Sequence, residues 1–143
     1  MESIETKVLQ KALEVLETKG WCQRMFGKKE DGVKDDILDR YEDSPNTRVE
    51  TVIKDIEFCS IGACRIATLD YIEKHDDVFS LKSRHMFSGA SQRFIRLAIE
   101  ESDPEFKKDK SSLITAWNDQ EGRTKGEVLA VFRRAIELSK AAT

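Results

Sequence analysis

Residues 61–72 read IGACRIATLDYI, and only Arg65 and Asp70 are charged in this run, whereas 36% of the 143 residues in the chain are charged. A helix over these residues is apolar around most of its circumference, which is the pattern of a buried helix. Gly62 and Ala63 at its start are small enough to let another backbone approach closely. We therefore expect this helix to be the central and most buried element.

Amphipathic helices are predicted at both ends of the chain. Apolar residues recur three and four positions apart between Ile4 and Leu16, and Gly20 can end that helix in a left-handed conformation. Near the other end, Thr124 and Glu127 fit the S/T-x-x-E capping box. The apolar residues that follow fall on one side of a helix running toward the C-terminus.

The middle of the chain predicts two more helices. One starts at Ser44 or Thr47 and carries an apolar stripe within residues 49–56. The other contains residues 94–99 and is ended by Asp103-Pro104. A brief stretch over residues 35–41 could add a short helix, but it is too short to stand on its own.

The connections between these helices are charged or rich in turn-forming residues. Residues 27–32 predict a charged loop, and residues 75–85 predict a turn before Ser88-Gly89-Ala90-Ser91, with at most a minor hairpin over residues 78–86. The predicted fold class is all-α. We expect a compact bundle of about five helices with one long charged connection, formed as a single domain over residues 1–143.

Composition limits the classes of function. The 24 basic and 27 acidic residues give a formal charge of -3 and are interspersed along the chain, which disfavours binding to duplex nucleic acid. The apolar runs are far shorter than the roughly 20 residues that span a bilayer, and the acidic N-terminus is unlike a secretory signal. We therefore expect a cytoplasmic protein that has no membrane contact.

The cysteines point to the same compartment. Their number is three, which is odd, and none of them belongs to a C-x-x-C pair. This pattern favours reduced thiols over a disulfide framework, and it predicts no metal site and no cofactor.

Cys59 is a candidate nucleophile, because it stands just before the central helix, where the helix dipole can stabilise a thiolate. A nucleophile also needs a base, and His75 and His85 are the two histidines of the chain. The alternative interpretation is that Cys59 is a small buried thiol packed in the core.

Residues 116–123 hold the candidate binding residues. Trp117 offers an apolar wall, and Asn118, Asp119 and Arg123 offer donors and acceptors near a helix N-terminus, to which a partner or a small anionic ligand could bind. The alternative interpretation is a polar loop in which Asn118 and Asp119 bond their own backbone in an Asx turn.

The two stretches are expected to meet. Small residues at Gly62 and Ala63 leave room for a neighbour, and the large side chain of Trp117 needs a partner surface. We therefore predict that residues 59–63 pack against residues 116–119, with Trp117 mostly buried. The Asn118 side chain should then turn inward to bond backbone groups near Cys59 or Ser60.

Three motifs carry a resemblance. The chain contains G-W-C-Q at residues 20–23, C-x-x-G-A at residues 59–63, and A-W-N-D-x-x-x-R-T-x-x-E-V at residues 116–128. In these motifs and their spacing it resembles an uncharacterised family of small bacterial and phage proteins, a domain of unknown function. The resemblance implies a compact fold and a phage or mobile-element setting, and it assigns no catalytic role.

Three functions remain open on the sequence. The first is a non-enzymatic interaction or regulatory module that acts on a host component through a protein partner bound at residues 117–123. The second is a cysteine-dependent hydrolase or transferase with Cys59 as nucleophile, His75 or His85 as base, and Asn118 or Asp119 as the orienting group. The third is a binder of a small anionic ligand such as a nucleotide, with Trp21 or Trp117 stacking on the base.

Overall fold

The computed structural model describes residues 2–24, 27–29, 49–53, 56–75 and 81–142, and for residues 27–29, 51–52 and 81–88 it describes the backbone alone. In this part of the chain helices dominate, so the predicted all-α class is confirmed. The elements are α1 (Ile4–Lys19), β1 (Gly27–Lys29), α3 (Val49–Val52), β2 (Ile56–Phe58), α4 (Ser60–His75), α5 (Leu81–Ser102), α6 (Leu113–Asn118) and α7 (Lys125–Ala141).

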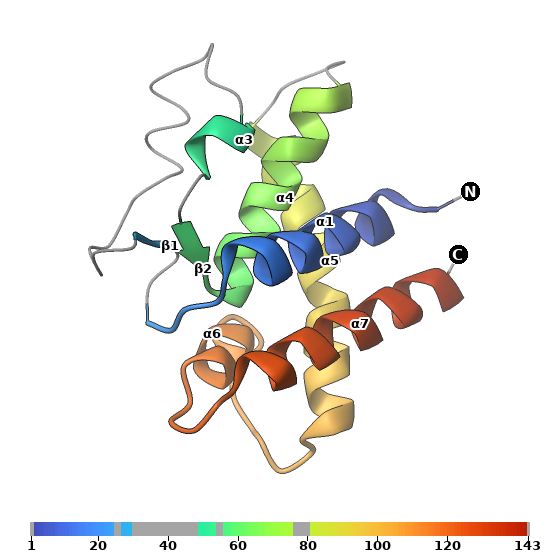
Figure 1. The fold of residues 1–143 in the computed structure, drawn as a ribbon. Coiled ribbons are helices and arrows are strands. Elements are labelled where there is room, and N and C mark those ends of the chain that lie inside the picture. Colours follow the sequence, from blue (N-terminus) through green and yellow to red (C-terminus); the bar gives the residue numbers. More distant parts are fainter. Residues whose placement is uncertain (1, 25–26, 30–48, 54–55, 76–80, 143) are drawn as a thin grey trace.

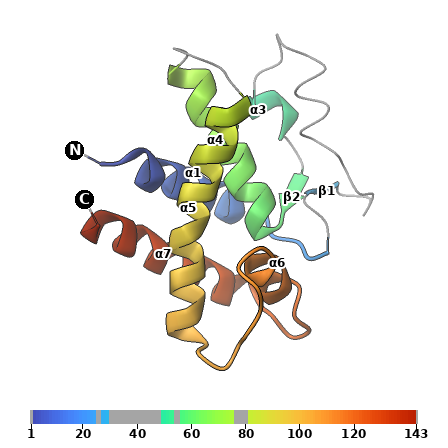
Figure 2. The same cartoon turned by 180° about the vertical axis from the view of Figure 1, so that it is seen from behind.

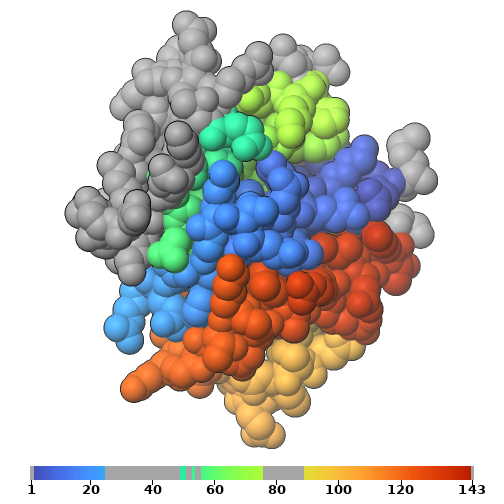
Figure 3. All heavy atoms as spheres, viewed as in Figure 1, coloured from blue at the N-terminus to red at the C-terminus, as the bar shows by residue number. Residues whose placement is uncertain are grey.

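The four long helices form two layers. α1 and α7 lie side by side and run in opposite directions, so the two termini lie on the same side of the molecule (Figure 1). Figure 3 shows these two helices together on one face. α4 and α5 form the second layer and are seen in front of α1 and α7 when the molecule is viewed from behind (Figure 2).

α4 is the buried element that residues 61–72 predict. Ala63, Cys64 and Ala67 have no exposed surface, and α4 packs against α1, α5 and the short helices α3 and α6. The core around it includes Phe58, Phe132 and large aliphatic residues from α1 and α5. Each such side chain contributes about 1.5–3 kcal/mol when it is fully buried, so burial around α4 is a main source of stability.

The first helix ends at Gly20 and the last begins at Thr124, as predicted. In α1, the Ser3 hydroxyl accepts a hydrogen bond from the Thr6 amide, and Gly20 follows the last turn with φ +108°. The Gly20 amide donates to the Leu16 carbonyl, which closes that turn. A Cβ at Gly20 would lie 3.0 Å from Glu57 Cγ, so the position needs glycine for its conformation and for its close approach to β2.

α7 begins with the predicted capping box. The Glu127 amide donates to Thr124 Oγ1 at 3.2 Å, and the Thr124 amide donates to Glu127 Oε1 at 3.0 Å. At the far end of this helix, the buried hydroxyls of Ser139 and Thr6 are 2.7 Å apart. This hydrogen bond ties the C-terminal end of α7 to the first turn of α1.

The sheet corrects two predictions. β1 pairs antiparallel with β2, so residues 27–29 are a strand where a charged loop was expected. The predicted helical stripe over residues 49–56 is wrong in its second part, because α3 ends at Val52 and Ile56 begins β2. Ile56 and Phe58 are buried while Glu57 is only half-buried, which is the alternation of a strand. The predicted starts at Ser44 and Thr47 and the short helix over residues 35–41 lie outside the described residues.

α5 corrects a third prediction. It starts at Leu81 and runs through the expected break at Ser88-Gly89-Ala90-Ser91, so the predicted turn over residues 75–85 and hairpin over residues 78–86 are wrong from residue 81 onward. A glycine in a helix interior costs only about 1 kcal/mol. Burial of Phe94, Ile95 and Ile99 on the same helix outweighs that cost. α5 ends at Ser102, as Asp103-Pro104 predicts, and the charged residues 103–112 connect it to α6.

None of the helices in the described ranges is long and apolar enough to cross a bilayer.

Candidate functional site

Asn118 stands at the centre of a buried polar junction, where the three motif segments meet. Its side chain is 1% exposed, although it belongs to one of the most polar residue types. The side-chain oxygen Oδ1 accepts hydrogen bonds from the Ser60 amide at 3.0 Å, the Ser60 hydroxyl at 2.7 Å and the indole Nε1 of Trp21 at 2.8 Å. The side-chain nitrogen Nδ2 donates to the Cys22 carbonyl at 3.2 Å and to Asp119 Oδ1 at 2.9 Å.

Neighbouring residues extend the junction toward the surface. Gln23 donates through Nε2 to the backbone carbonyls of Asn118 and Gln120, at 3.0 Å in each case. Asp119 Oδ1 also accepts from the backbone amide of Arg24, a residue held at φ +67°. We use the name Asn118 junction for Trp21, Cys22, Gln23, Arg24, Ser60, Asn118 and Asp119.

The Asn118 junction confirms one prediction and corrects another. Residues 59–63 do pack against residues 116–119, Trp117 is buried at 2% exposure, and Asn118 bonds the Ser60 backbone as expected. Asn118 is not part of a polar loop with an Asx turn, because it ends α6 and its side chain bonds residues 58 or more positions away. Together with Asp119 Oδ1, which accepts the second Nδ2 hydrogen, these long-range partners use every donor and acceptor of the amide.

Arg123 holds the loop between α6 and α7 in place. Its guanidinium lies 3.9 Å from the centre of the Trp117 ring, a cation–π contact, and its Nε donates to the Trp117 carbonyl at 2.9 Å. The same side chain forms an ion pair with Glu127 at 2.8 Å. The Glu127 carboxyl has a lowered pKa, chiefly because the Thr124 amide donates to its carboxylate, then because of the Thr124 hydroxyl and Arg123.

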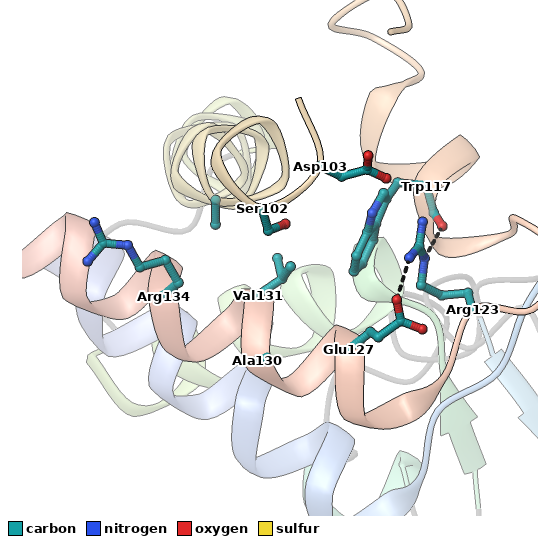
Figure 4. Close-up of a pocket in the computed structure, with 9 residues that line it drawn as sticks. Ser102, Asp103, Trp117, Arg123, Glu127, Ala130, Val131 and Arg134 are labelled. Carbon is teal, nitrogen blue, oxygen red and sulfur yellow. Dashed lines mark hydrogen bonds and ion pairs between the residues drawn. The ribbon is translucent and has the colours of Figure 1, made fainter. Parts of the chain in front are cut away.

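A cavity of about 300 Å³ is lined by Trp117, the residue that precedes Asn118. It lies between the end of α5, α6 and the first half of α7. Figure 4 shows Trp117 between the Arg123 side chain and the space bordered by Ser102 and Val131, with Arg134 at the far end. We call it the Trp117 pocket; its lining is Ala98, Ser102, Asp103, Trp117, Arg123, Glu127, Ala130, Val131 and Arg134.

Two polar groups of the Trp117 pocket lack a partner among the described residues. The indole Nε1 of Trp117 is buried and has no acceptor. The carboxylate of Asp103 forms no ion pair with any cation in the described ranges. A second buried polar atom without a partner there, Asp70 Oδ1, lies on α4 outside the pocket lining, and the other oxygen of Asp70 pairs with Lys74.

A family model matches residues 4–138 of the chain, and its description is a family of unknown function, DUF6197. The chain belongs to this family. No curated protein and no solved structure matches the chain. The description of this family names no activity.

The candidate nucleophile Cys59 of this DUF6197 chain and the candidate base His75 are not brought together. Cys59 is buried, and burial raises the pKa of its thiol, which opposes thiolate formation. Its sulfur accepts a hydrogen bond from the Gly62 amide at 3.3 Å. His75 ends α4, and a 16-residue helix spans about 24 Å, so His75 lies at the opposite end from Cys59.

His85 lies in the second turn of α5, which starts at Leu81, six positions after the last residue of α4. The His75 ring itself stacks on Tyr71 and its Nδ1 is 2.8 Å from the Tyr71 carbonyl oxygen. Within the described residues, no group of three His, Cys, Asp or Glu side chains could hold a metal ion.

The four predicted binding residues divide between the two regions. Asn118 and Asp119 belong to the Asn118 junction, whereas Trp117 and Arg123 line the pocket. Stacking of a nucleotide base is disfavoured at Trp117, which is buried and has one face covered by Arg123.

Sequence reasoning missed the pocket residues of α5 and α7. Ser102, Ala130 and Arg134 are small or charged residues on amphipathic helices, which the sequence alone presents as ordinary solvated positions. The signal that could have drawn attention to them is the large Trp117 side chain, which needs a wall of small residues beside it.

Proposed function

We propose that this DUF6197 chain is a non-enzymatic interaction module, and that a protein partner binds it at the Trp117 pocket. The observation that carries the proposal is the cavity of about 300 Å³ lined by Trp117, whose buried indole N–H has no acceptor in the described chain. A buried donor left unpaired costs about 1–3 kcal/mol, so a bound group that supplies an acceptor to this N–H would recover that free energy.

The pocket is also built on rigid elements. Its walls come from the long helices α5 and α7, and its floor residue Trp117 is held by Arg123 on one side. The Arg123 guanidinium is in turn fixed by Glu127, which belongs to the capping box of α7. A site held in this way binds without paying for much local ordering.

The setting of this function is part of the proposal. We propose a cytoplasmic protein, encoded by a phage or another mobile element, that acts on a component of its bacterial host. The resemblance carried by the motifs at residues 20–23, 59–63 and 116–128 supports this setting. The alternative of a Cys59 enzyme has less support, because the Cys59 thiol is buried and His75 lies at the far end of α4.

The test is site-directed photo-crosslinking in the native host cell. A photoreactive residue is placed at Ala130, which lines the pocket and is exposed, or at Lys7, an exposed residue of α1 outside it. We expect one discrete crosslinked protein from position 130 and none from position 7.

A blocking variant makes the result specific. Ser102→Phe fills the pocket from the exposed end of α5 and should abolish the crosslink from position 130 while leaving the fold intact. The same product from positions 7 and 130, or a product that survives Ser102→Phe, would contradict the proposed function.

A further inference from the structure

The charges that line the Trp117 pocket are balanced. The lining carries two guanidinium groups, Arg123 and Arg134, and two carboxylates, Asp103 and Glu127. Both guanidinium groups are already engaged, because Arg123 pairs with Glu127 and Arg134 pairs with one carboxylate of α5 and one of α7. A charged occupant would gain little net attraction from this lining and would lose its own hydration. The balance of charge therefore favours a neutral occupant.

The lining also holds one hydrogen-bond donor and one acceptor that are unused. The indole Nε1 of Trp117 is buried and has no acceptor among the described residues. The Asp103 carboxylate accepts no hydrogen bond and forms no ion pair within the described ranges, although the Asp103 backbone is bonded to Ile99 and Phe106. A neutral occupant that offers an acceptor to Trp117 and a donor to Asp103 would satisfy both groups.

These two groups stand at the same end of the pocket. Figure 4 shows Asp103 next to Trp117, with Arg134 at the other end. A backbone peptide group has a donor and an acceptor, but in the trans form its N–H and C=O point in opposite directions. A primary carboxamide carries its oxygen and its NH₂ on one carbon, so a single planar group can accept and donate on the same side. Asparagine and glutamine are the residues that carry this group.

The size and walls of the pocket suit the longer of the two. A volume of about 300 Å³ is at the lower end of the range for ligand sites, about 300–1,000 Å³. Ala98, Ala130 and Val131 offer apolar surface to the two methylene groups of a glutamine stem. Because Trp117 Nε1 is buried, binding includes a small turn of the ring edge toward the cavity. No hydrogen bond of the indole has to break for this turn, and Arg123 contacts the ring on its face.

We infer that the occupant of the Trp117 pocket is a glutamine side chain presented by the protein partner. The inference rests on the proposed function and names the chemistry of the partner. The carboxamide oxygen accepts from Trp117 Nε1, the carboxamide nitrogen donates to the Asp103 carboxylate, and the stem packs between α5 and α7.

The two tryptophans provide the readout. Protein labelled with ¹⁵N at tryptophan gives two indole N–H resonances, from Trp117 in the pocket and from Trp21 in the Asn118 junction. The probe is a capped tripeptide with a central glutamine. Matched tripeptides carry glutamate, whose carboxylate only accepts, lysine, whose ammonium only donates, or norleucine, which does neither. The backbone is the same in all four, so a difference between them reports the side chain.

We expect the glutamine tripeptide to shift the Trp117 indole proton downfield in a saturable way, as a new hydrogen bond does, and to leave Trp21 unmoved. Asp103→Ala should weaken this binding about tenfold, the effect of losing one charge-assisted hydrogen bond. Asp109→Ala is the matched control, because it makes the same change at an exposed residue outside the pocket and should leave the affinity unchanged.

Several results would overturn the inference: no Trp117 shift with the glutamine tripeptide, an equal shift with norleucine, equal affinities of the Asp103→Ala and Asp109→Ala variants, or equal or tighter binding of the glutamate or lysine tripeptide. If the glutamine tripeptide fails while the crosslink at position 130 remains sensitive to Ser102→Phe, the carboxamide occupant is wrong and the interaction function stands. If that crosslink fails as well, both are wrong.

Discussion

Trp21 and Trp117 are the two tryptophans of the chain, and their surroundings differ in kind. The Trp21 indole donates to Asn118, inside a junction where each polar atom of the Asn118 amide has a partner. The Trp117 indole has no acceptor and lines a cavity. Trp117 and Asn118 are adjacent in sequence, but Trp117 lines the pocket and Asn118 lies in the junction. We call the Asn118 junction the closed region and the Trp117 pocket the open region. We propose that the closed region stabilises the fold and that the open region binds a partner.

The largest loss of stability is expected from a substitution that disrupts the Asn118 junction. Asn118→Ala leaves the Ser60 amide and hydroxyl, the Trp21 indole and the Cys22 carbonyl without their partner in a buried place. At about 1–3 kcal/mol for each unpaired group, with partial relief by water, we expect a loss of about 3–5 kcal/mol in the free energy of unfolding. Urea denaturation measures it.

The control for this variant is Thr115→Ala, an exposed position on the same helix. It should change the free energy of unfolding by no more than about 0.5 kcal/mol. Similar losses for the two variants would show that the junction does not concentrate the stability of this region.

A smaller effect is expected at the cap that supports Arg123. Thr124→Ala removes the hydroxyl that accepts from the Glu127 amide and should cost about 1 kcal/mol, while Thr124→Ser should cost much less. Equal urea midpoints for wild type and Thr124→Ala would mean that the capping box adds nothing in solution.

The smallest effect on stability is expected at the Glu127 carboxyl, and it depends on pH. Its pKa is lowered in the folded chain, chiefly by the Thr124 amide, so its stabilising contribution is full above the unfolded pKa of about 4.3 and is lost as pH falls through the folded value. The stability difference between wild type and Glu127→Gln should therefore be constant above about pH 5.5 and shrink below pH 4. If the stability difference between wild type and Glu127→Gln grew on acidification, the prediction would be wrong.

The contacts of the two regions could not be predicted equally well from the sequence. The contact between Ser60 and Asn118 could be predicted, because Gly62 and Ala63 mark a place of close approach and Trp117 needs a wall. The capping box at Thr124 could be predicted because its partners are three residues apart. Trp21 could not be assigned to Asn118, since the two residues are 97 positions apart and nothing local encodes their meeting.

The predictions that the structure corrects failed because local sequence does not encode packing between distant segments. β2 is only three residues long, too short for its alternation to be distinguished from the end of a helix. The break expected at Ser88-Gly89-Ala90-Ser91 is overridden by packing further along α5. Asp103 was recognised as the end of a helix, but its place in the lining of the Trp117 pocket depends on α7, which the sequence does not place beside it.

Hydrogen exchange of the two indole protons, followed by NMR on protein labelled with ¹⁵N at tryptophan, tests the contrast between the closed and the open region most directly. The Trp21 proton is hydrogen-bonded to Asn118 and should exchange only when the fold opens globally. The Trp117 proton has no acceptor and should exchange faster, through small local openings at the pocket. Equal exchange rates, or a Trp117 proton more protected than that of Trp21, would contradict this division of the molecule.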